Sequence, residues 1–443
     1  MQIRRFVSKY RALFIFAGPA LITSMAYMDP GNYGTDIQAG AAFNYGLLWV
    51  VWMANFMAMF LQYLSGKLGI ATGNDLAGLV RESLKKSSRR RFDIFLNWIG
   101  AEAAVASTDL AEYLGTVIAL NILFHVPLLY ASLFGAADIL ILLALTSRRF
   151  RSLEYFFMVF ISIIGVGFLY EVAVTGLDVT QLVHAFVSPD LNPNNIVLIV
   201  GIIGATVMPH ALYVHSTLTR DKVADRTGEE KKHLLKLHTG ECLVAFTIAG
   251  MVNAAILIVS AQAFYPKFSN ISAVDEAYRI MIPIYGSLAA IMFAVTLLCS
   301  GIASSTTGTL AGQAIMDGLL GTKVNKTVRR IITRVINVFP TTIAVLLGFD
   351  PLFLLVYSQV LLSLMIALPM IPLITFTAKK DLMGPLVNKR LTTFLALLTG
   401  TVIVALNTYL IYYLVAQSSV YLQAIILGAY GAYHLYLVYA TLQ

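Results

Sequence analysis

Four consecutive residues, Asp29-Pro30-Gly31-Asn32, interrupt an apolar stretch that is otherwise long enough to span a membrane. A carboxylate at bilayer depth costs about 3 kcal/mol on insertion scales. Pro30 removes a backbone donor and Gly31 lowers helix propensity, so the helix should break here. Such a break is tolerated within a membrane only where it is buried in protein or lines a watery cavity. The segment therefore predicts a bound ion or polar solute, with oxygen atoms of Asp29 and Asn32 as ligands.

A second break is expected in the apolar stretch 195–219, where Pro209 follows Met208. Unwinding at both breaks would free backbone carbonyls, and Met208 adds a thioether sulfur. Oxygen ligands alone suit Mg²⁺ and Ca²⁺, whereas a sulfur ligand shifts the preference toward transition metals. The predicted ligands are the side chains of Asp29, Asn32 and Met208 and the carbonyls of Ala26 and Ala205. The alternative is that Pro209 only kinks a helix and Met208 only packs.

Ionisable side chains near the breaks could carry protons. Glu102, Asp109 and Glu112 are seven and three residues apart, which places them in one broad sector of a helix. Histidine titrates near neutral pH and could relay a proton. Arg334, with Arg330 as a second candidate, could pair with the carboxylates. The residues expected on a proton pathway are His210, Asp109, Glu112, Arg334 and His215. The alternative is that the charged groups form structural ion pairs and each histidine is hydrogen bonded in the core.

Further polar residues lie at depth in predicted spans. Gln359 could be an outer ligand of the ion, whereas Asn253 and Asn407 are expected to form hydrogen bonds between helices. The two cysteines, Cys242 and Cys299, are expected to be small packing residues and not a disulfide or a metal pair.

The elements that must position these residues are membrane-spanning helices. Of the 443 residues, 58% are hydrophobic and 12% are charged, against about 25% charged in a soluble domain. We predict an all-α polytopic membrane protein that forms a single transmembrane domain over residues 1–443. About twelve spans are expected, at 12–43, 46–72, 94–124, 127–146, 152–176, 195–219, 240–264, 285–318, 333–349, 351–376, 391–416 and 419–441.

The net charge of +8 could indicate nucleic-acid binding, but the distribution of the charge argues against it. All of the 31 Lys and Arg residues except Lys267 and Arg279 fall in or beside the N-terminal segment and alternate loops. This alternation is typical of membrane proteins whose basic loops face the cytoplasm, and it predicts that both termini are cytoplasmic. The basic loops are 67–91, 148–151, 220–236, 323–334 and 379–390.

The two breaks occupy matching positions if the chain contains two repeats of five spans. The first repeat would cover about 12–176 and the second about 195–376, with spans 11 and 12 (about 391–441) added outside the repeat. Because five is odd, the second repeat would be inverted in the membrane. Interrupted spans at matching positions point to the binding site of an inverted-repeat transporter.

The segments around both breaks resemble the Nramp family of divalent-metal/proton symporters. The resemblance is carried by Ala26-Tyr27-Met28-Asp29-Pro30-Gly31-Asn32 and Gly204-Ala205-Thr206-Val207-Met208-Pro209-His210. It extends over spans 1–10 through Thr35-Asp36-Ile37-Gln38-Ala39-Gly40, Thr108-Asp109-Leu110-Ala111-Glu112, Leu212-Tyr213-Val214-His215-Ser216 and Ser358-Gln359-Val360.

The resemblance implies a LeuT-like fold of two inverted five-helix repeats and a metal site for Mn²⁺ or Fe²⁺ formed by the ligands named above. It implies a proton-coupled importer in the cell membrane, with metal ions, protons and the lipid bilayer as partners and no enzyme activity, resident cofactor or nucleic acid. Met208 argues against the magnesium-transporting branch of the family. Two competing hypotheses are a sodium-coupled carrier of organic solutes with the same fold and a passive channel or metal-binding receptor.

Overall fold

The structure is a computed structural model in which every secondary-structure element of the described residues is a helix, with no strand among them. The description covers residues 18–442, apart from 86, 135–149, 188–191, 224–225, 227, 272–273, 323–324, 326–327, 330, 333–338, 340–341, 344–345 and 350.

Nine helical segments in the described part of the chain are long and apolar enough to cross a membrane. They coincide with nine of the predicted spans. They are α4 (Leu48–Thr72), α6 (Arg90–Phe124), α9 (Phe150–Thr175), α11 (Ile196–Val207) with α12 (Pro209–Arg220), α13 (Gly228–Phe264), α15 (Ser287–Ile315) with η4 (Met316–Leu320), α17 (Pro351–Met365) with α18 (Ala367–Ala378), α20 (Arg390–Val415) and α21 (Val420–Leu442).

The three remaining predicted spans have different outcomes. The first is present but divided into α2 (Pro19–Ser24), η1 (Ala26–Met28) and α3 (Pro30–Phe43). Of the span predicted at 127–146, only α7 (Leu128–Phe134) belongs to the described residues. The span predicted at 333–349 lies mostly outside them.

The first span breaks where the sequence predicts, between η1 and α3. Asp29 adopts an extended conformation, and its Oδ1 accepts a hydrogen bond of 2.9 Å from the backbone N–H of Asn32. Pro30 occupies the first position of α3, where a missing N–H costs no intrahelical hydrogen bond. The carboxylate that is expensive in a membrane therefore also caps the helix that follows it.

The second break separates α11 from α12 at Met208. Its backbone has φ 39° and ψ 101°, a conformation with positive φ that a residue with a side chain rarely adopts. Such a conformation costs on the order of 1–3 kcal/mol and persists only where the surroundings hold it. Pro209 then begins α12, as Pro30 begins α3.

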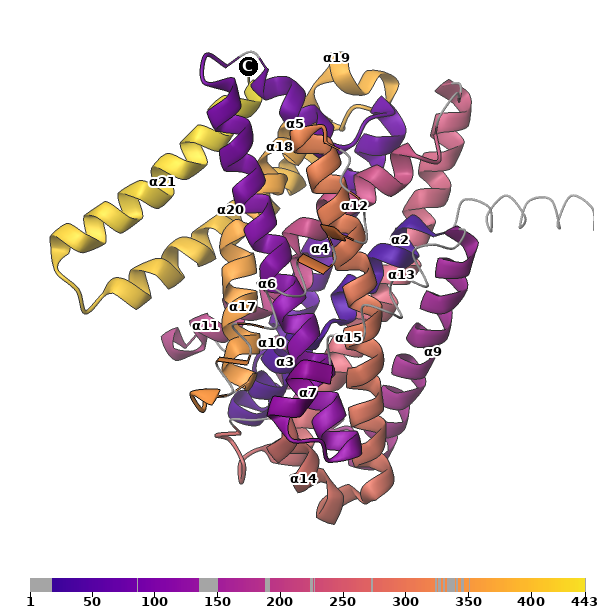
Figure 1. The fold of residues 1–443 in the computed structure, drawn as a ribbon, viewed down its shortest axis with the longest axis vertical. Helices are drawn as coiled ribbons and strands as arrows, with labels where there is room; N and C mark the ends of the chain where they lie inside the picture. The colour runs from indigo at the N-terminus through magenta and orange to yellow at the C-terminus, as the bar shows by residue number, and fades with distance from the viewer. Residues whose placement is uncertain are drawn as a thin grey trace, which may run out of the picture.

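The helices around the breaks enclose them. Helix α13 packs against α3 and α4, α15 packs against α6, α9 and η1, and α17 packs against α11, α6 and α3. Figure 1 shows α3 and α4 in the interior of the bundle, with α9 along one side. Asp29, Asn32, Met208 and His210 are consequently fully buried.

The two C-terminal helices lie at the edge of the bundle. Helix α21 packs against α20 and α18, and both α20 and α21 extend away from the bundle on the side opposite α9 (Figure 1). They are the spans expected outside the repeats.

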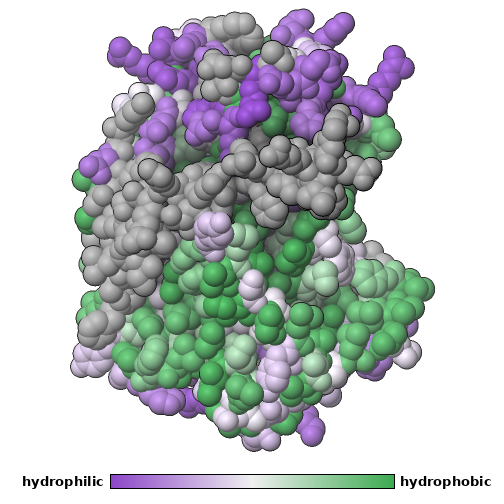
Figure 2. All heavy atoms as spheres, turned by 90° about the vertical axis from the view of Figure 1, so that its right-hand side faces the viewer, coloured by the Kyte–Doolittle hydropathy of each residue, from purple (hydrophilic) through white to green (hydrophobic). Residues whose placement is uncertain are grey.

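Polar residues gather at one end of the molecule, whereas hydrophobic side chains cover much of the remaining visible surface (Figure 2). Helices α5 (Leu76–Leu84) and α19 (Lys380–Met383) lie at the same end, and α14 (Val274–Tyr285) lies at the other. Because α5 and α19 belong to two of the basic loops, this arrangement agrees with the prediction that these loops share one side of the membrane.

Candidate metal site

The Asp29 carboxylate is fully buried at the first break, and its two oxygen atoms differ. Oδ1 accepts hydrogen bonds from the backbone N–H of Asn32 at 2.9 Å and from the side-chain amide of Asn32 at 2.7 Å. Oδ2 has no hydrogen-bond partner among the described residues. A buried charge is costly unless it is paired. Oδ2 is therefore the atom of this site that most requires a positively charged ligand.

The side chain of Asn32 connects the two breaks. Its amide nitrogen donates to Asp29 Oδ1, to the carbonyl of Tyr27 at 3.2 Å and to the carbonyl of Ala205 at 3.1 Å. Ala205 lies on α11, so the contact joins the first broken span to the second. The amide nitrogen thus lies where three oxygen atoms converge, two of which belong to predicted metal ligands.

The amide oxygen of Asn32 is held from the opposite side. It accepts hydrogen bonds from Thr206 Oγ1 at 3.3 Å and from Asn253 Nδ2 at 3.2 Å. Asn253 on α13 also donates to the carbonyl of Tyr27 at 3.0 Å. Asn253 links helices, as expected from the sequence, but its position at the site was not predicted. Thr206 was missed, although it is a polar residue in the motif of the second break.

The remaining predicted ligands, Ala26 and Met208, are buried at the two breaks. Ala26 begins η1, which packs against α11. Tyr27 Oη donates to the carbonyl of Val207 at 3.4 Å, which ties η1 to the last residue of α11. The two breaks therefore face each other, as a site shared between them requires.

Gln359 on α17 lies against both breaks. A Cβ atom placed on Gly31 would overlap the Gln359 side-chain amide and lie 2.8 Å from Asp29 Oδ2. A Cβ atom on Gly204 would overlap the Gln359 carbonyl. The side-chain oxygen of Gln359 is buried and has no hydrogen-bond partner within the described chain. Glycine at both positions thus lets α17 bring the side-chain amide of Gln359 close to Asp29.

His210 and the carboxylates of α6 lie beyond the second break. His210 is fully buried, and its Nδ1 lies 3.1 Å from Thr108 Oγ1 on α6. Asp109 and Glu112 both face Gly308 of α15, because a Cβ atom there would lie 2.9 Å from Asp109 Oδ1 and 3.0 Å from Glu112 Oε2. Both carboxylates are buried. The expected clustering of ionisable groups on one face of α6 is thus present in the structure.

Arg329 pairs with a carboxylate on the same face of α6. Its Nη2 lies 2.6 Å from Glu102 Oε1, and its guanidinium group packs against Gly312, one turn after Gly308 on α15. Arg334, the arginine predicted for the proton pathway, lies outside the described residues. Asp109 and Glu112 therefore share the interface between α6 and α15 with an ion pair.

His215 is placed apart from these carboxylates. Its Nδ1 lies 2.8 Å from Gln62 Oε1 on α4 and 3.4 Å from Thr23 Oγ1. Its ring stands edge-on to that of His238, with the centroids 5.0 Å apart. The described structure thus joins His215 to α4 and α13 and not to the group around His210.

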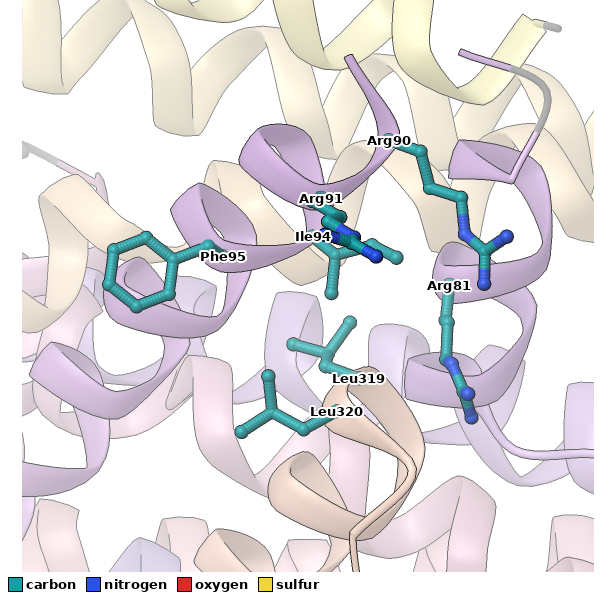
Figure 3. A pocket seen from close by; sticks show the side chains of 7 residues that line it. All are labelled: Arg81, Arg90, Arg91, Ile94, Phe95, Leu319 and Leu320. Carbon is teal, nitrogen blue, oxygen red and sulfur yellow. The ribbon is translucent and has the colours of Figure 1, made fainter. Parts of the chain in front are cut away.

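One hollow at the polar end of the molecule has the wrong charge for a cation. It has a volume of about 360 Å³, and α5, α6 and η4 contribute its lining residues (Figure 3). The interior site presents a carboxylate, amides and carbonyls, whereas this hollow presents guanidinium groups, which repel cations. The lining residues are Arg81, Arg90, Arg91, Ile94, Phe95, Leu319 and Leu320.

The resemblance noted in the sequence is borne out by comparison with known proteins. The family model described as natural resistance-associated macrophage protein-like, Nramp, matches residues 20–413. The chain belongs to the Nramp family. Similar curated relatives include the divalent metal cation transporter MntH of Deinococcus radiodurans, 40% identical over 91% of this chain and 90% of the relative. MntH of Bacillus subtilis is 38% identical over 91% of this chain and 93% of the relative. As a member of a transporter family, this Nramp chain is not an enzyme, as predicted.

Solved structures confirm the predicted LeuT-like fold. The manganese transporter of Eremococcus coleocola, crystallised with an aromatic bis-isothiourea compound, matches this Nramp chain with a TM-score of 0.87 and 28% identity. The match covers 98% of this chain and 95% of the other. Mhp1, a nucleobase-cation-symport-1 family transporter, matches with a TM-score of 0.57 and 14% identity, over 96% of this chain and 91% of the other. The likeness to Mhp1 concerns the fold alone.

Proposed function

We propose that this Nramp chain imports divalent transition-metal ions, chiefly Mn²⁺ and Fe²⁺, across the cell membrane together with protons. The ion would bind between the two broken spans, with Asp29, Asn32 and Met208 and the carbonyls of Ala26 and Ala205 as ligands. Membership in the Nramp family and relatives named as divalent metal cation transporters support transport of divalent metal cations. The choice among metals and the coupling to protons rest on the residues.

The observation that carries the proposal is the Asp29 carboxylate. It is fully buried, its Oδ2 lacks a hydrogen-bond partner among the described residues, and the carbonyl of Ala205 is directed toward the same centre. A cation placed there would compensate the buried negative charge and use carbonyl dipoles that the breaks have freed. A neutral solute would leave the charge uncompensated.

Sulfur supports the choice of a transition metal. Met208 is buried at the second break, where its unusual backbone conformation separates α11 from α12. A thioether is a soft ligand that Mg²⁺ and Ca²⁺ do not favour, whereas first-row transition metals accept it beside oxygen donors. This argument disfavours a magnesium transporter.

The proton would pass along the interface of α6 and α15. His210 contacts Thr108 on α6, and Asp109 and Glu112 lie just after Thr108 on the same helix. The pair of Glu102 and Arg329 lies on the other side of Thr108, nearer the N-terminus of α6. The interface thus places two carboxylates, a residue type that can accept and release protons, beside the ion pair of Glu102 and Arg329. Arg334 and His215 remain predictions for this route.

Transport would follow alternating access, in which one part of the bundle moves against another around the site. The matching breaks, each followed by a proline that begins the next helix, support the two inverted repeats predicted at about 12–176 and 195–376. The basic loops at one end support cytoplasmic termini. An inside-negative membrane potential would then favour entry of the divalent cation.

Uptake into proteoliposomes tests the proposal. The purified chain should take up Mn²⁺ and Fe²⁺ in a saturable manner, with faster uptake when the outside is more acidic and with acidification of the lumen. Ca²⁺ and Mg²⁺ should compete weakly. Asp29→Ala should abolish uptake, because the site loses its anionic ligand. Gly165→Ala is a matched control, since a Cβ atom at this helical glycine would meet no atom within 4 Å.

The competing hypotheses give different results in the same assay. A sodium-coupled solute carrier would respond to a sodium gradient and show no Mn²⁺ uptake. A passive channel or receptor would not accumulate Mn²⁺ in response to a pH gradient. Near-normal Mn²⁺ uptake by Asp29→Ala would show that the ion does not bind at the breaks.

A further inference from the structure

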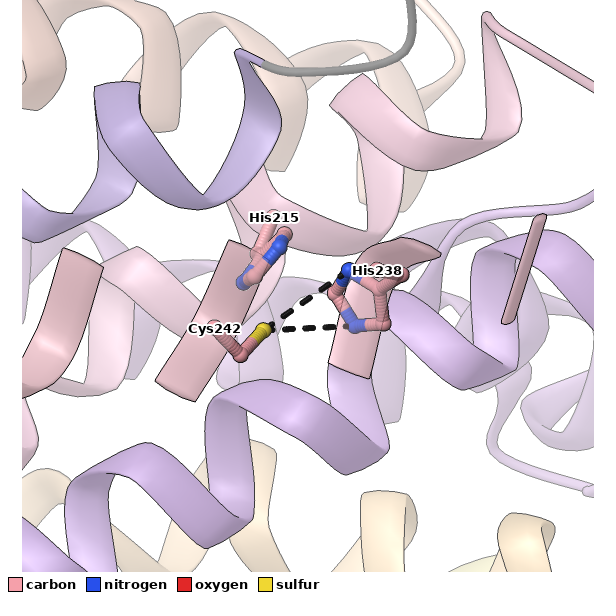
Figure 4. A group of neighbouring side chains, drawn as sticks. All are labelled: His215, His238 and Cys242. Carbon is pink, nitrogen blue, oxygen red and sulfur yellow. Dashed lines mark hydrogen bonds between the residues drawn. The ribbon is translucent and has the colours of Figure 1, made fainter. Parts of the chain in front are cut away.

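A second group of metal-ligating side chains lies outside the candidate site. His215 on α12 and His238 and Cys242 on α13 are buried, with exposed fractions of 0%, 0% and 2%. His238 and Cys242 are four residues apart and so share one face of α13. Each of the three residues offers a ligand atom within 4.8 Å of the other two (Figure 4). The cluster therefore joins two helices through three soft or borderline donors.

The hydrogen bonds around His215 leave one ring nitrogen available. The Gln62 amide nitrogen donates to Tyr27 Oη at 2.8 Å, so the Gln62 amide oxygen is the acceptor that faces His215. His215 Nδ1 therefore carries the proton that it donates to Gln62, and Nε2 keeps its lone pair. His215 Nε2 is buried and has no hydrogen-bond partner among the residues that the structure describes.

The same reasoning applies to His238. Its Nε2 lies 3.3 Å from the carbonyl of Tyr63 on α4, and a carbonyl can only accept. Nε2 therefore carries the proton, which leaves the lone pair on Nδ1. A carbonyl or amide oxygen that binds the far nitrogen of an imidazole is the arrangement that orients histidine ligands in metal sites. Gln62 and Tyr63 are neighbours on α4, so one helix fixes both rings.

The sulfur of Cys242 completes the set at a suitable separation. Cys242 Sγ lies 3.7 Å from His238 Nδ1 and 3.5 Å from His238 Nε2 (Figure 4). In a tetrahedral zinc site, with Zn–S of about 2.3 Å and Zn–N of about 2.0–2.1 Å, nitrogen and sulfur ligands lie about 3.6 Å apart. Gly66 of α4 provides space for the His238 ring, because a Cβ atom there would overlap it.

We propose that His215 Nε2, His238 Nδ1 and Cys242 Sγ form a second metal site, which binds a soft divalent ion such as Zn²⁺ or Cd²⁺. Two imidazoles and a thiolate suit these ions, whereas the site at the breaks is rich in oxygen and suits Mn²⁺. Binding would deprotonate the Cys242 thiol and release one proton to solvent for each ion. The three protein ligands leave a fourth position for water. Cys242 is free and buried, as expected of a packing residue, and the proposal gives its thiol a further role.

The site would tie α12 to α13. Helix α12 is the second half of the broken span that carries Met208, and His215 is linked through Gln62 to Tyr27 beside the first break. A bound ion would therefore hold together elements that also build the candidate transport site, without occupying that site.

Thiolate-to-metal charge transfer tests the proposal, because a thioether does not give this band. The probe is Cd²⁺, added to the purified full chain in detergent, with Cys299→Ala as the parent so that Cys242 is the remaining thiol. One Cd²⁺ per chain should give the ultraviolet band in the parent, and the band should disappear in Cys242→Ser. His238→Asn should weaken the Cd²⁺ affinity that the band reports by at least about tenfold.

Two controls separate this site from the transport site and from misfolding. Asp29→Ala removes the proposed cargo site and should leave the band unchanged. Mn²⁺ uptake by Cys242→Ser should equal that of the parent, because serine keeps the size of the side chain. Absence of the band from the parent, its persistence in Cys242→Ser, or its loss in Asp29→Ala with the fold intact would overturn the proposal.

Discussion

A methyl group at position 31 should disturb the proposed ion site through Gln359. The Cβ atom of Gly31→Ala would overlap the Gln359 amide and lie 2.8 Å from Asp29 Oδ2, well inside ordinary van der Waals contact. Overpacking of this kind typically costs about 1–3 kcal/mol. Because 1.4 kcal/mol corresponds to a factor of ten, the Kd for Mn²⁺ should rise about 5- to 150-fold if the strain falls on the ion-binding arrangement.

Isothermal titration calorimetry of Mn²⁺ in the four combinations of Gly31→Ala and Gln359→Ala measures this effect. Shortening Gln359 removes the overlap, so the penalty of Gly31→Ala should shrink by at least about 1 kcal/mol, roughly fivefold in Kd. Gly165→Ala, at a helical glycine with no neighbouring atom within 4 Å, should leave the Kd unchanged. An equal penalty of Gly31→Ala with and without Gln359 would refute the placement of this side chain beside Asp29.

Three further substitutions address the sulfur ligand, the proton pathway and the ion pair. Met208→Ala should lower selectivity against Ca²⁺ and Mg²⁺ more than it lowers Mn²⁺ binding, and unchanged competition by Ca²⁺ in calorimetry would count against a thioether ligand. Glu112→Gln should uncouple protons from metal, seen as reduced acidification per Mn²⁺ taken up; unaltered acidification would favour a structural role for the carboxylates. Arg329→Gln should lower the free energy of unfolding by about 1–3 kcal/mol. This loss is smaller than the loss expected when a fully buried ion pair is broken, because the side chain of Glu102 is 29% exposed. Thermal unfolding in detergent measures this loss, and Glu102→Gln in the same chain should recover part of it.

The breaks could be predicted from sequence because local residues determine them. Pro30 and Pro209 cannot continue an apolar helix, and Asp29 cannot face lipid, whatever the rest of the chain does. The spans could be predicted for a similar reason, since length and hydrophobicity decide which segments cross a bilayer. These features required no knowledge of which helices are neighbours.

Contacts between distant segments could not be read from the sequence in the same way. Several arginines follow one another between 323 and 334, and only packing against Gly312 shows that Arg329 reaches Glu102. The role of Gly31 likewise depends on which residue of α17 lies opposite. For such residues, the sequence gives the residue type but not the atoms that its side chain contacts.

The buried cluster on α12 and α13 could be predicted from the sequence only in part. The spacing of His238 and Cys242 already places both on one helix face. His215, however, was predicted only for the proton pathway, and its contact with His238 depends on how α12 and α13 both pack against α4. A search for His and Cys pairs one turn apart would have identified two of the three residues of the cluster.

The amide of Asn32 has a consequence for turnover. Its hydrogens are shared among Asp29 Oδ1 and the carbonyls of Tyr27 and Ala205. An arriving cation would compete with the Asn32 amide for these three oxygens. Because the oxygens attract a monovalent ion only weakly, such an ion would gain little binding free energy by displacing the amide. After the ion departs, the amide can return, which satisfies the oxygens without cargo. One side chain would thus set a threshold for loading and make the unloaded carrier stable enough to reset.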